Sequence, residues 1–567
     1  MDRRVEPKLL PRIFDLLAGL LAFGVIVFLA ETSRELMQPL PALQAAPVAL
    51  DPATLPHDAA RTTLRMLAAL ALSLAFTFTY ATAAAKSRRA ERLLIPLLDI
   101  LQSVPILGFV SVTVVFFMSL APGRALGAEL AAIFAIFTSQ AWNMAFSFYQ
   151  SLRTVPAELR EAADSFRMSA WMRFWRLEVP FAMPQLVWNM MMSMSGGWFF
   201  VVAAEAISVG NTQVTLPGVG SYIALAVASR DLAAVGWAIG AMLVVIVIYD
   251  QLLFRPLVAW ADGLRFEQES GVPPARSWVL AILRRSRMVR AALAAAGALW
   301  RRTYRIGPLN PVGTRAAAGS RWGDLVWNSA LVLVAGWALW QVIRFALTGV
   351  APAEVATVLA LGLATFARVA LLIALASLIW VPVGVWVGLR PALAHAIQPV
   401  AQFLAAFPAN LLFPLAVSAI VAWRLDPDVW LSPLMILGTQ WYILFNVIAG
   451  AAAIPSELRH AAANFHVSGW LWWQRIALPA VFPYYVTGAI TAAGGSWNAS
   501  IVAEVATWGD TRLQAHGLGA YIARATEAGD FHRIVLGIAV MSLFVVTINR
   551  AFWRPLYERA ERRYKLG

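Results

Sequence analysis

Residues 156–184 read PAELREAADSFRMSAWMRFWRLEVPFAMP, a long polar stretch between two apolar segments. The pattern returns at residues 455–483 as PSELRHAAANFHVSGWLWWQRIALPAVFP, without a gap and at a constant offset of 299 residues. The recurring residues of the first copy include Pro156, Glu158, Leu159, Arg160, Ala162, Ala163, Phe166, Trp171, Arg176, Pro180 and Pro184. Identity at so many positions predicts an internal duplication.

The composition is that of a membrane protein. Of 567 residues, 60% are hydrophobic and 13% are charged, which is too apolar for a soluble protein of several domains. The net charge of +14 fits arginines retained on the cytoplasmic side of many spans, so we expect no nucleic-acid partner. The chain has no cysteine, which excludes disulfides and thiolate metal ligands.

Twelve apolar segments of the sequence have the roughly 20 residues that a bilayer-spanning helix needs. Those of the first half lie near 13–31, 62–84, 98–120, 126–149, 185–208 and 233–256. Those of the second half lie near 325–347, 367–389, 401–423, 430–452, 484–507 and 532–554. With an even number in each half, both halves run the same way through the membrane. We predict an all-α polytopic membrane protein with a first unit at 1–257, a linker at 258–323 and a second unit at 324–567.

Lysine and arginine gather in alternate loops, as is typical of cytoplasmic segments. The basic segments are the N-terminus, the loops at 86–92 and 153–176, and the C-terminus. No small-residue cleavage site follows Leu29, so we expect the first span to be a retained anchor. Both termini and both copies of the duplicated loop are expected in the cytoplasm.

The linker at 258–323 is rich in arginine and carries an amphipathic pattern. Its apolar residues on one helical face are Trp278, Ile282, Val289, Leu293, Ala296 and Trp300. Arg284, Arg287 and Arg290 fall elsewhere. The pattern predicts a helix in the membrane interface against anionic lipid; a specific protein-docking or regulatory role is the alternative.

The duplicated stretch resembles the EAA loop of the permease subunits of binding-protein-dependent ABC importers. That loop reads Glu-Ala-Ala, three residues, Gly, and after a spacer an apolar residue, Leu and Pro. The matching residues are Glu161, Ala162, Ala163 and Pro180 in the first copy and Ala461, Ala462, Leu478 and Pro479 in the second. The departures are Arg167 and His466 at the Gly position, Val179 at the Leu and His460 at the Glu. Gly ordinarily serves at that position because it takes a positive φ after a short helix.

The resemblance implies two parallel six-helix ABC-importer permease (MetI-like) units in a bacterial inner membrane. In that family the loop is a coupling helix that seats on a separate ATP-hydrolysing subunit, so two symmetric loops imply two such subunits. The candidate coupling residues are Glu158, Glu161, Ala162, Ala163, Phe166, Glu457, Ala461, Ala462 and Phe465. An ordinary amphipathic helix on the membrane surface is the alternative.

The sequence contains no nucleotide-binding loop. Its three lysines, Lys8, Lys86 and Lys565, have no preceding Gly, so Gly-x-x-x-x-Gly-Lys-Ser/Thr is missing. We therefore expect no enzymatic activity and no cofactor in this chain, with ATP and Mg bound by the partner. The resemblance also implies an external substrate-binding protein, for which the residues themselves give no indication.

Four charged residues lie inside the predicted spans at matching places. Glu205 and Glu504 are near the outward end of the fifth span of each half, and Arg65 and Arg368 near the outward start of the second. Charges at such depth are usually paired, so we predict the ion pairs Arg65–Glu205 and Arg368–Glu504. The pairs brace helix packing or contact the substrate, and the need of a buried charge for a partner favours the first.

The surroundings of these residues resemble the permeases for nitrate, sulfonate, taurine and bicarbonate. That subfamily shows Val-Ala-Glu followed by Gly-x-Gly-Tyr-Leu. The later motif reads Gly218, Gly220, Tyr222 and Ile223 in one half and Gly517, Gly519, Tyr521 and Ile522 in the other. The resemblance implies a small anion as substrate.

Small and polar residues cluster in the middle of the fifth spans. The cluster comprises Ser195 and Trp198 in the first half and Ser496, Trp497 and Asn498 in the second. Together with Gln102 of the third span, these residues are candidates for lining a central path. Close helix packing through the neighbouring glycines is the alternative.

Other classes of protein fit the sequence less well. The six histidines include no pair spaced i, i+4, so we propose no metal site, and no nucleophile and base form a catalytic constellation. Twelve spans in parallel halves also suit an autonomous secondary transporter of the major facilitator type. Against this alternative, the large polar loop of each half lies between spans four and five, and the loop between spans two and three lacks Gly-Asp-Arg.

Overall fold

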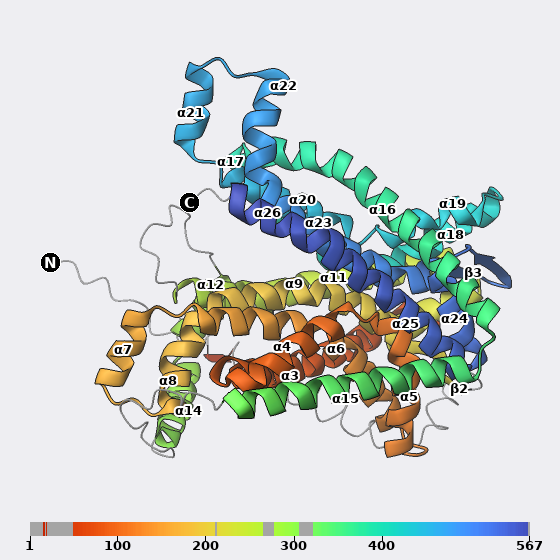
Figure 1. The fold of residues 1–567 in the computed structure, drawn as a ribbon, viewed down its shortest axis with the longest axis horizontal. Helices are drawn as coiled ribbons and strands as arrows, with labels where there is room; N and C mark the ends of the chain where they lie inside the picture. The colour runs from red at the N-terminus through yellow and green to blue at the C-terminus, as the bar shows by residue number, and fades with distance from the viewer. Residues whose placement is uncertain are drawn as a thin grey trace.

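The computed structural model describes residues 15–16, 19, 49–209, 212–264, 277–304 and 321–564. Long helices run along a common direction in two groups, one from each half of the chain, except that the second-half helix at Arg321–Thr348 lies along the first group (Figure 1). The helices of the first half are α3 (Leu55–Lys86), α4 (Arg88–Ser103), α5 (Ile106–Leu120), α6 (Ala125–Arg153), α7 (Ala157–Ser165), α8 (Ala170–Arg173), α9 (Val179–Glu205), α10 (Val219–Ala228), α11 (Leu232–Tyr249) and α12 (Arg255–Asp262). The linker contributes α13 (Trp278–Arg285) and α14 (Arg287–Thr303).

The second half repeats this order of elements. Its helices are α15 (Arg321–Thr348), α16 (Pro352–Gly388), α17 (Pro391–Ala406), α18 (Phe413–Ala422), α19 (Pro427–Trp430), α20 (Gln440–Ala452), α21 (Ser456–Asn464), α22 (Gly469–Trp472), α23 (Leu478–Ala503), α24 (Leu518–Ala528), α25 (Phe531–Ile548) and α26 (Arg554–Tyr564). Short π-helical turns occur at equivalent places, at Phe174–Glu178 and Asp250–Phe254 and again at Trp473–Ala477 and Asn549–Trp553.

Within the described residues, seven helices are long and apolar enough to cross a membrane, or ten if each of three bent pairs is one span. These lie at predicted positions. Of the two remaining predictions, the span at 13–31 falls largely outside the described residues, and the span at 98–120 is divided into α4 and α5. The all-α polytopic architecture is confirmed, while the number twelve stays a prediction.

Proline bends the third span of each half. Val104 before Pro105 and Phe407 before Pro408 both have extended backbone, because a proline ring disfavours the helical region for the residue before it. In the second half this break turns the chain by 80°. The segments after the breaks, α5 and η4 (Ala409–Leu412), pack against the opposite half: α5 against α23, α24 and α25, and η4 against α9 and α11.

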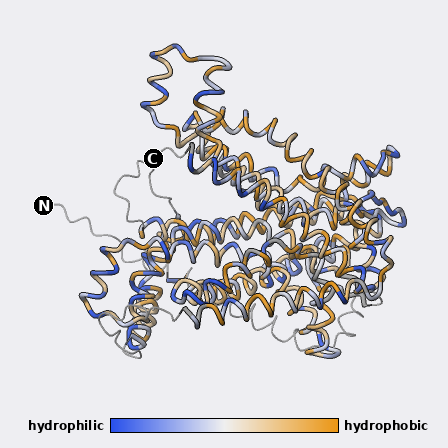
Figure 2. The backbone as a smooth tube through the Cα atoms, in the orientation of Figure 1, coloured by the Kyte–Doolittle hydropathy of each residue, from blue (hydrophilic) through white to orange (hydrophobic). Residues whose placement is uncertain are grey.

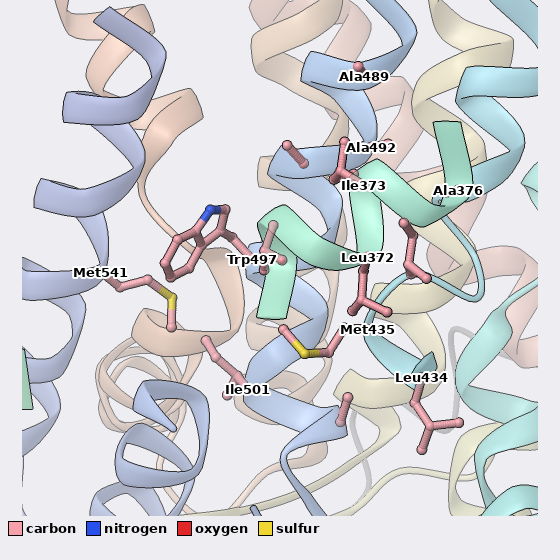
Figure 3. Close-up of a cluster of buried hydrophobic side chains, with 14 of the residues drawn as sticks. Leu372, Ile373, Ala376, Leu434, Met435, Ala489, Ala492, Trp497, Ile501 and Met541 are labelled. Carbon is pink, nitrogen blue, oxygen red and sulfur yellow. The ribbon is translucent and has the colours of Figure 1, made fainter. Parts of the chain in front are cut away.

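Each half has its own apolar core, and the bent spans join the two. In the second core Trp497 lies among Leu372, Ile373, Met435 and Met541 (Figure 3). The first core includes two second-half residues, Phe407 and the fully buried Leu411. Full burial of a leucine side chain contributes about 1.5–3 kcal/mol, so the crossing segments hold the halves together.

Two short hairpins follow the fifth spans, and their first strands begin just before the ends that the sequence predicted for these spans, at 208 and 507. They are β1 (Ala206–Val209) with β2 (Thr212–Thr215), and β3 (Val505–Trp508) with β4 (Thr511–Gln514), both antiparallel. Both are rich in the β-branched residues that favour strands. The hairpins lie at one end of the molecule, while α7, α8, α21 and α22 project from the other (Figure 1). Hydrophilic residues gather on these projecting loops (Figure 2).

Candidate functional site

Arg65 is the centre of a buried charge network in the first half. Its Nη1 donates to Glu205 Oε1 over 2.7 Å and to the Pro217 carbonyl oxygen over 2.9 Å. The other side of the guanidinium binds Glu129 in a bidentate pair, with Nε–Oε2 at 2.5 Å and Nη2–Oε1 at 2.6 Å. The Arg65 side chain is 4% exposed and that of Glu205 is fully buried. One cation thus holds two carboxylates away from water.

Uncharged donors complete the coordination of Glu205. The Thr62 hydroxyl donates to Oε1 over 2.7 Å, and the Gly220 N–H donates to Oε2 over 2.7 Å. Thr62 in turn accepts from the Val219 N–H over 3.1 Å. The network therefore ties α3, α6, α9 and the start of α10 together. Such complete pairing is what a buried charge needs, which favours the bracing role over substrate contact.

The second half repeats the network in a more open form. Arg368 Nη1 lies 3.3 Å from Glu504 Oε1, and its Nη2 lies 2.8 Å from Asp428 Oδ1. The Thr365 hydroxyl donates to Glu504 over 2.8 Å, as Thr62 does to Glu205. Asp428 is also shared with His516, whose Nδ1 lies 2.8 Å from Oδ2 and whose side chain is 85% exposed. The two predicted pairs therefore form in the structure, but in different environments.

The glycines after the hairpins make room for the carboxylates. A Cβ on Gly218 would overlap the Glu205 carboxylate, and one on Gly517 would overlap that of Glu504. Gly218 (φ 168°) and Gly517 (φ −161°) both have extended backbone that any residue can adopt, so space and not backbone freedom explains the residue type. The Gly-x-Gly pattern is thus part of the charge network.

The sequence analysis missed the third member of each network. Glu129 and Asp428 occupy equivalent positions at the 299-residue offset, and each pairs with its arginine. An acidic residue at the same place in both copies was the available signal.

Two asparagines join the halves at the centre of the molecule. Asn498 Oδ1 accepts from the Ile106 N–H over 2.8 Å at the start of α5. Asn410 Nδ2 donates to the Phe199 carbonyl oxygen over 3.1 Å. Asn498 also borders a central cavity of about 100 Å³, whose walls include Phe199, Phe407 and Tyr442 from both halves. The candidate path residue Asn498 therefore lies at the interface of the halves.

The other candidate path residues have varied surroundings. Ser496 is fully buried, with its Oγ 3.0 Å from Thr439 Oγ1, and Trp497 stacks on Phe544 with ring centroids 6.1 Å apart. Both therefore pack helices, as the alternative interpretation holds. Trp198 is 1% exposed and borders a cavity of about 690 Å³ between α9, α11 and α17. Gln102 donates to Asn143 Oδ1 over 2.5 Å, and the side chain of Ser195 lies outside the described residues.

The two EAA-like loops form matching helices, α7 and α21, whose N-caps are Pro156 and Pro455. One alanine of each copy, Ala163 and Ala462, is buried against the molecule. The remaining candidate coupling residues, Glu158, Glu161, Ala162, Glu457 and Ala461, lie on α7 and α21 outside the buried set. At the helix ends Phe166 is 80% exposed and Phe465 is 81% exposed. Aromatic residues are enriched in protein–protein interfaces, so these two side chains are candidates for contact with a partner.

The first turn of α21 keeps its negative charge. The pKa of the Glu457 carboxyl lies below its usual value. The larger cause is a hydrogen bond from its own backbone N–H, and the second is the Ser456 hydroxyl, which donates to Oε1 over 3.1 Å. Negative charge at a helix N-terminus is stabilised by the helix dipole.

The turns after these helices are made without glycine. Arg167 has φ 50° and His466 has φ 52°, in the left-handed region. The Met168 N–H donates to the Ala163 carbonyl oxygen over 3.1 Å, which closes the usual helix-ending turn. The departures from the EAA pattern therefore keep its turn geometry, at a cost of roughly 1–2 kcal/mol per residue.

The chain matches the family of the binding-protein-dependent transport system inner membrane component at residues 67–256 and 380–554, more than half of its length. The chain belongs to this family and carries its unit twice, which confirms the duplication and the resemblance.

Similar proteins include three transport permease proteins. The bicarbonate transport system permease protein CmpB of Synechococcus elongatus is 29% identical over 190 residues, 33% of this chain and 64% of the relative. The nitrate import permease protein NrtB of Leptolyngbya laminosa is 26% identical over 186 residues, 33% of this chain and 63% of the relative. The glycine betaine/carnitine transport permease protein GbuB of Listeria monocytogenes is 30% identical over 170 residues, 30% of this chain and 54% of the relative. Each alignment covers less than two thirds of the relative.

Proposed function

We propose that the chain is the whole membrane-spanning part of an ATP-driven importer, two permease units fused in one polypeptide. The observation that carries this proposal is the pair of matching helices α7 and α21 at one end of the molecule (Figure 1). Each carries a glutamate in its first turn, Glu158 or Glu457, and ends at an exposed phenylalanine, and each lies within one of the two matched family units. Two equivalent surfaces suit two copies of one cytoplasmic ATPase subunit, which would bind ATP and Mg.

The proposed substrate is a small anion. The names of CmpB and NrtB, which concern bicarbonate and nitrate, support this choice. The path would run between the halves past Asn498, because both halves contribute walls to the cavity there. Arg65 and Arg368 are proposed to brace the helices, since acidic partners already hold them. The family description supports an external substrate-binding protein as a further partner.

The proposed location is the bacterial inner membrane, with both termini and both coupling loops in the cytoplasm. The alternation of basic loops supports this orientation. The common end of α7 and α21 agrees with it (Figure 1).

Co-purification tests the proposal. The tagged chain is extracted in mild detergent from cells that co-express candidate ATPase subunits, and the bound subunits are counted by native mass spectrometry. We expect two ATPase copies per chain, one after either Glu158→Lys or Glu457→Lys, and none after both. The matched control is Glu527→Lys, an exposed glutamate on α24 at the hairpin end of the molecule.

Transport in liposomes separates the proposal from the main alternative. With the ATPase inside and ATP present, we expect uptake of the anion to stop in the double charge reversal. A chain that purifies alone and takes up substrate on an ion gradient without ATP is a secondary transporter, and the proposal is then wrong.

A further inference from the structure

The linker helix α14 packs on one of the two coupling loops. The Trp300 ring lies 6.2 Å from that of Trp171 and 5.1 Å from that of Trp175. Trp171 Nε1 donates to Thr303 Oγ1 over 3.1 Å. Figure 1 shows α14 beside α8, the short helix that follows the first coupling helix α7 in the chain. The linker is therefore attached to the loop that leads from α7 to α9.

The second coupling loop has a different surface at the equivalent place. Trp470, the counterpart of Trp171, is 68% exposed, against 41% for Trp171. Gln474 takes the place of Trp175. The aromatic seat for a linker helix therefore belongs to the first loop.

Contacts at both ends place α14 at the edge of the spans. At one end, Trp175 is one turn before Glu178, which pairs over 3.0 Å with Lys86 at the end of α3. At the other end, Asp15 Oδ1 accepts from the Ser286 hydroxyl over 2.6 Å and from the Met288 N–H over 3.1 Å. Asp15 lies at the start of the first predicted span. The headgroup layer adds about 5–7 Å to each side of the apolar core. Because both ends of α14 contact residues at the ends of spans, the helix lies at the level of this layer.

The charge of the linker helices has one sign. Residues 277–304 contain six arginines and neither aspartate nor glutamate. All six are exposed: Arg284, Arg285, Arg287, Arg290, Arg301 and Arg302. At 100° per residue, the arginines of α14 fall on one face of the helix, and Met288, Leu293 and Leu299 fall on the other. These three apolar side chains are 62%, 66% and 65% exposed.

We propose that α14 binds the anionic phospholipids of the cytoplasmic leaflet and so holds the first coupling loop, and not the second, at the membrane surface. A basic face opposite an exposed apolar face is the pattern of helices that lie in the headgroup layer of anionic membranes. The lipid-binding part stands independently of the proposed transport function. The part that concerns the first coupling loop rests on the proposed function, because it takes that loop to be a docking site for the ATPase.

A spin label on α14 tests lipid binding without any partner. The chain has no cysteine, so Leu299→Cys gives a single labelling site. The labelled full-length chain is placed in nanodiscs of phosphatidylcholine alone or of phosphatidylcholine with phosphatidylglycerol. Access of a water-soluble nickel complex and of oxygen to the label is then measured by electron paramagnetic resonance. With phosphatidylglycerol we expect nickel access to fall several-fold and oxygen access to rise.

Matched variants make the result specific. Replacing Arg287, Arg290, Arg301 and Arg302 by Gln removes exposed charges, and it should abolish the effect of phosphatidylglycerol while the chain still elutes as a folded peak. A label at Glu527→Cys, at the opposite end of the molecule, should not respond. Inorganic phosphate added to phosphatidylcholine nanodiscs should have no effect. Equal nickel access in both bilayers, or a lipid effect that survives the four substitutions, overturns the proposal.

Two further labels test the effect on the coupling loops. With phosphatidylglycerol, a label at Phe166→Cys should lose mobility and one at Phe465→Cys should not. Equal responses at both sites refute the asymmetry but leave lipid binding intact. If the label at residue 299 becomes protected from nickel on addition of an ATPase subunit and not of phosphatidylglycerol, α14 is a protein-docking surface and the proposal is wrong.

Discussion

Arg65 Nη1 lies 2.7 Å from Glu205 Oε1, and the same guanidinium holds Glu129 on its other side. The cation therefore has two acidic partners, while each carboxylate depends on the one cation. Removing Arg65 leaves two buried carboxylates without their cation. Removing the charge of Glu205 leaves Arg65 paired with Glu129.

We therefore predict unequal losses of stability within this network. Arg65→Gln should lower the free energy of unfolding by about 3–5 kcal/mol, since it leaves buried charge uncompensated. Glu205→Gln should cost less, about 1–3 kcal/mol. Unfolding by a denaturing detergent, followed by circular dichroism, gives both values. The interpretation fails if Glu205→Gln is the more damaging of the two.

Gly218→Ala should destabilise the chain, because the added methyl group meets the buried Glu205 carboxylate. We expect a loss of about 1–3 kcal/mol, the usual cost of overpacking. Gly517→Ala should behave in the same way against Glu504. The matched controls are Gly236→Ala and Gly240→Ala in α11, where the new methyl group meets open space. These controls should raise stability by about 0.5–1 kcal/mol. Similar effects at all four sites would contradict the role given to the Gly-x-Gly pattern.

Asn498→Ala should weaken the junction of the halves, because the Ile106 N–H at the start of α5 loses its acceptor. The loss of such a cap costs about 0.5–2 kcal/mol. The rate of amide hydrogen exchange at the start of α5 should also rise. The control is Asn446→Ala, whose amide donates to the Tyr442 carbonyl oxygen within its own helix. A larger effect at Asn446 than at Asn498 would argue against a junction at this point.

Arg167→Gly and His466→Gly should each stabilise the turn after a coupling helix, since both residues now have a positive φ. Relief of about 1 kcal/mol is expected from the known preference of this conformation for glycine. Slower amide hydrogen exchange in α7 and α21 would show that the turns have become more stable. Arg160→Gly, inside α7, should have the opposite effect, because glycine costs about 1 kcal/mol within a helix and the hydrogen bond from Arg160 Nη2 to the Leu152 carbonyl oxygen is lost as well. Faster exchange in α7 of Arg167→Gly would show that the arginine has a contact that outweighs the strain.

Part of the candidate site could be predicted because the same charged residues occur in both copies of the repeat. Chain direction placed Arg65 and Glu205 at one depth, and the repeat placed Arg368 and Glu504 in the same relation. The repeat also carried an acidic residue at Glu129 and Asp428, but hydropathy and spacing do not show which way these side chains face, so the two partners were missed. The unlike environments of the two networks were also beyond prediction. His516 replaces Pro217 of the first half, and its contact with Asp428 arises only because the chain at the end of β4 packs against α19.

The sequence by itself determined that this is a duplicated, parallel, helical membrane protein with two matching polar loops and paired charges inside its spans. Hydropathy, loop charge and repeat spacing are properties of the chain in one dimension, so they survive without a structure. The tertiary structure alone decided that α5 and η4 cross into the opposite half, that Asn498 caps a helix there, and that α14 covers one coupling loop. These relations depend on bends at proline and on the rotation of each helix about its axis. Such quantities are set by packing between segments far apart in the chain.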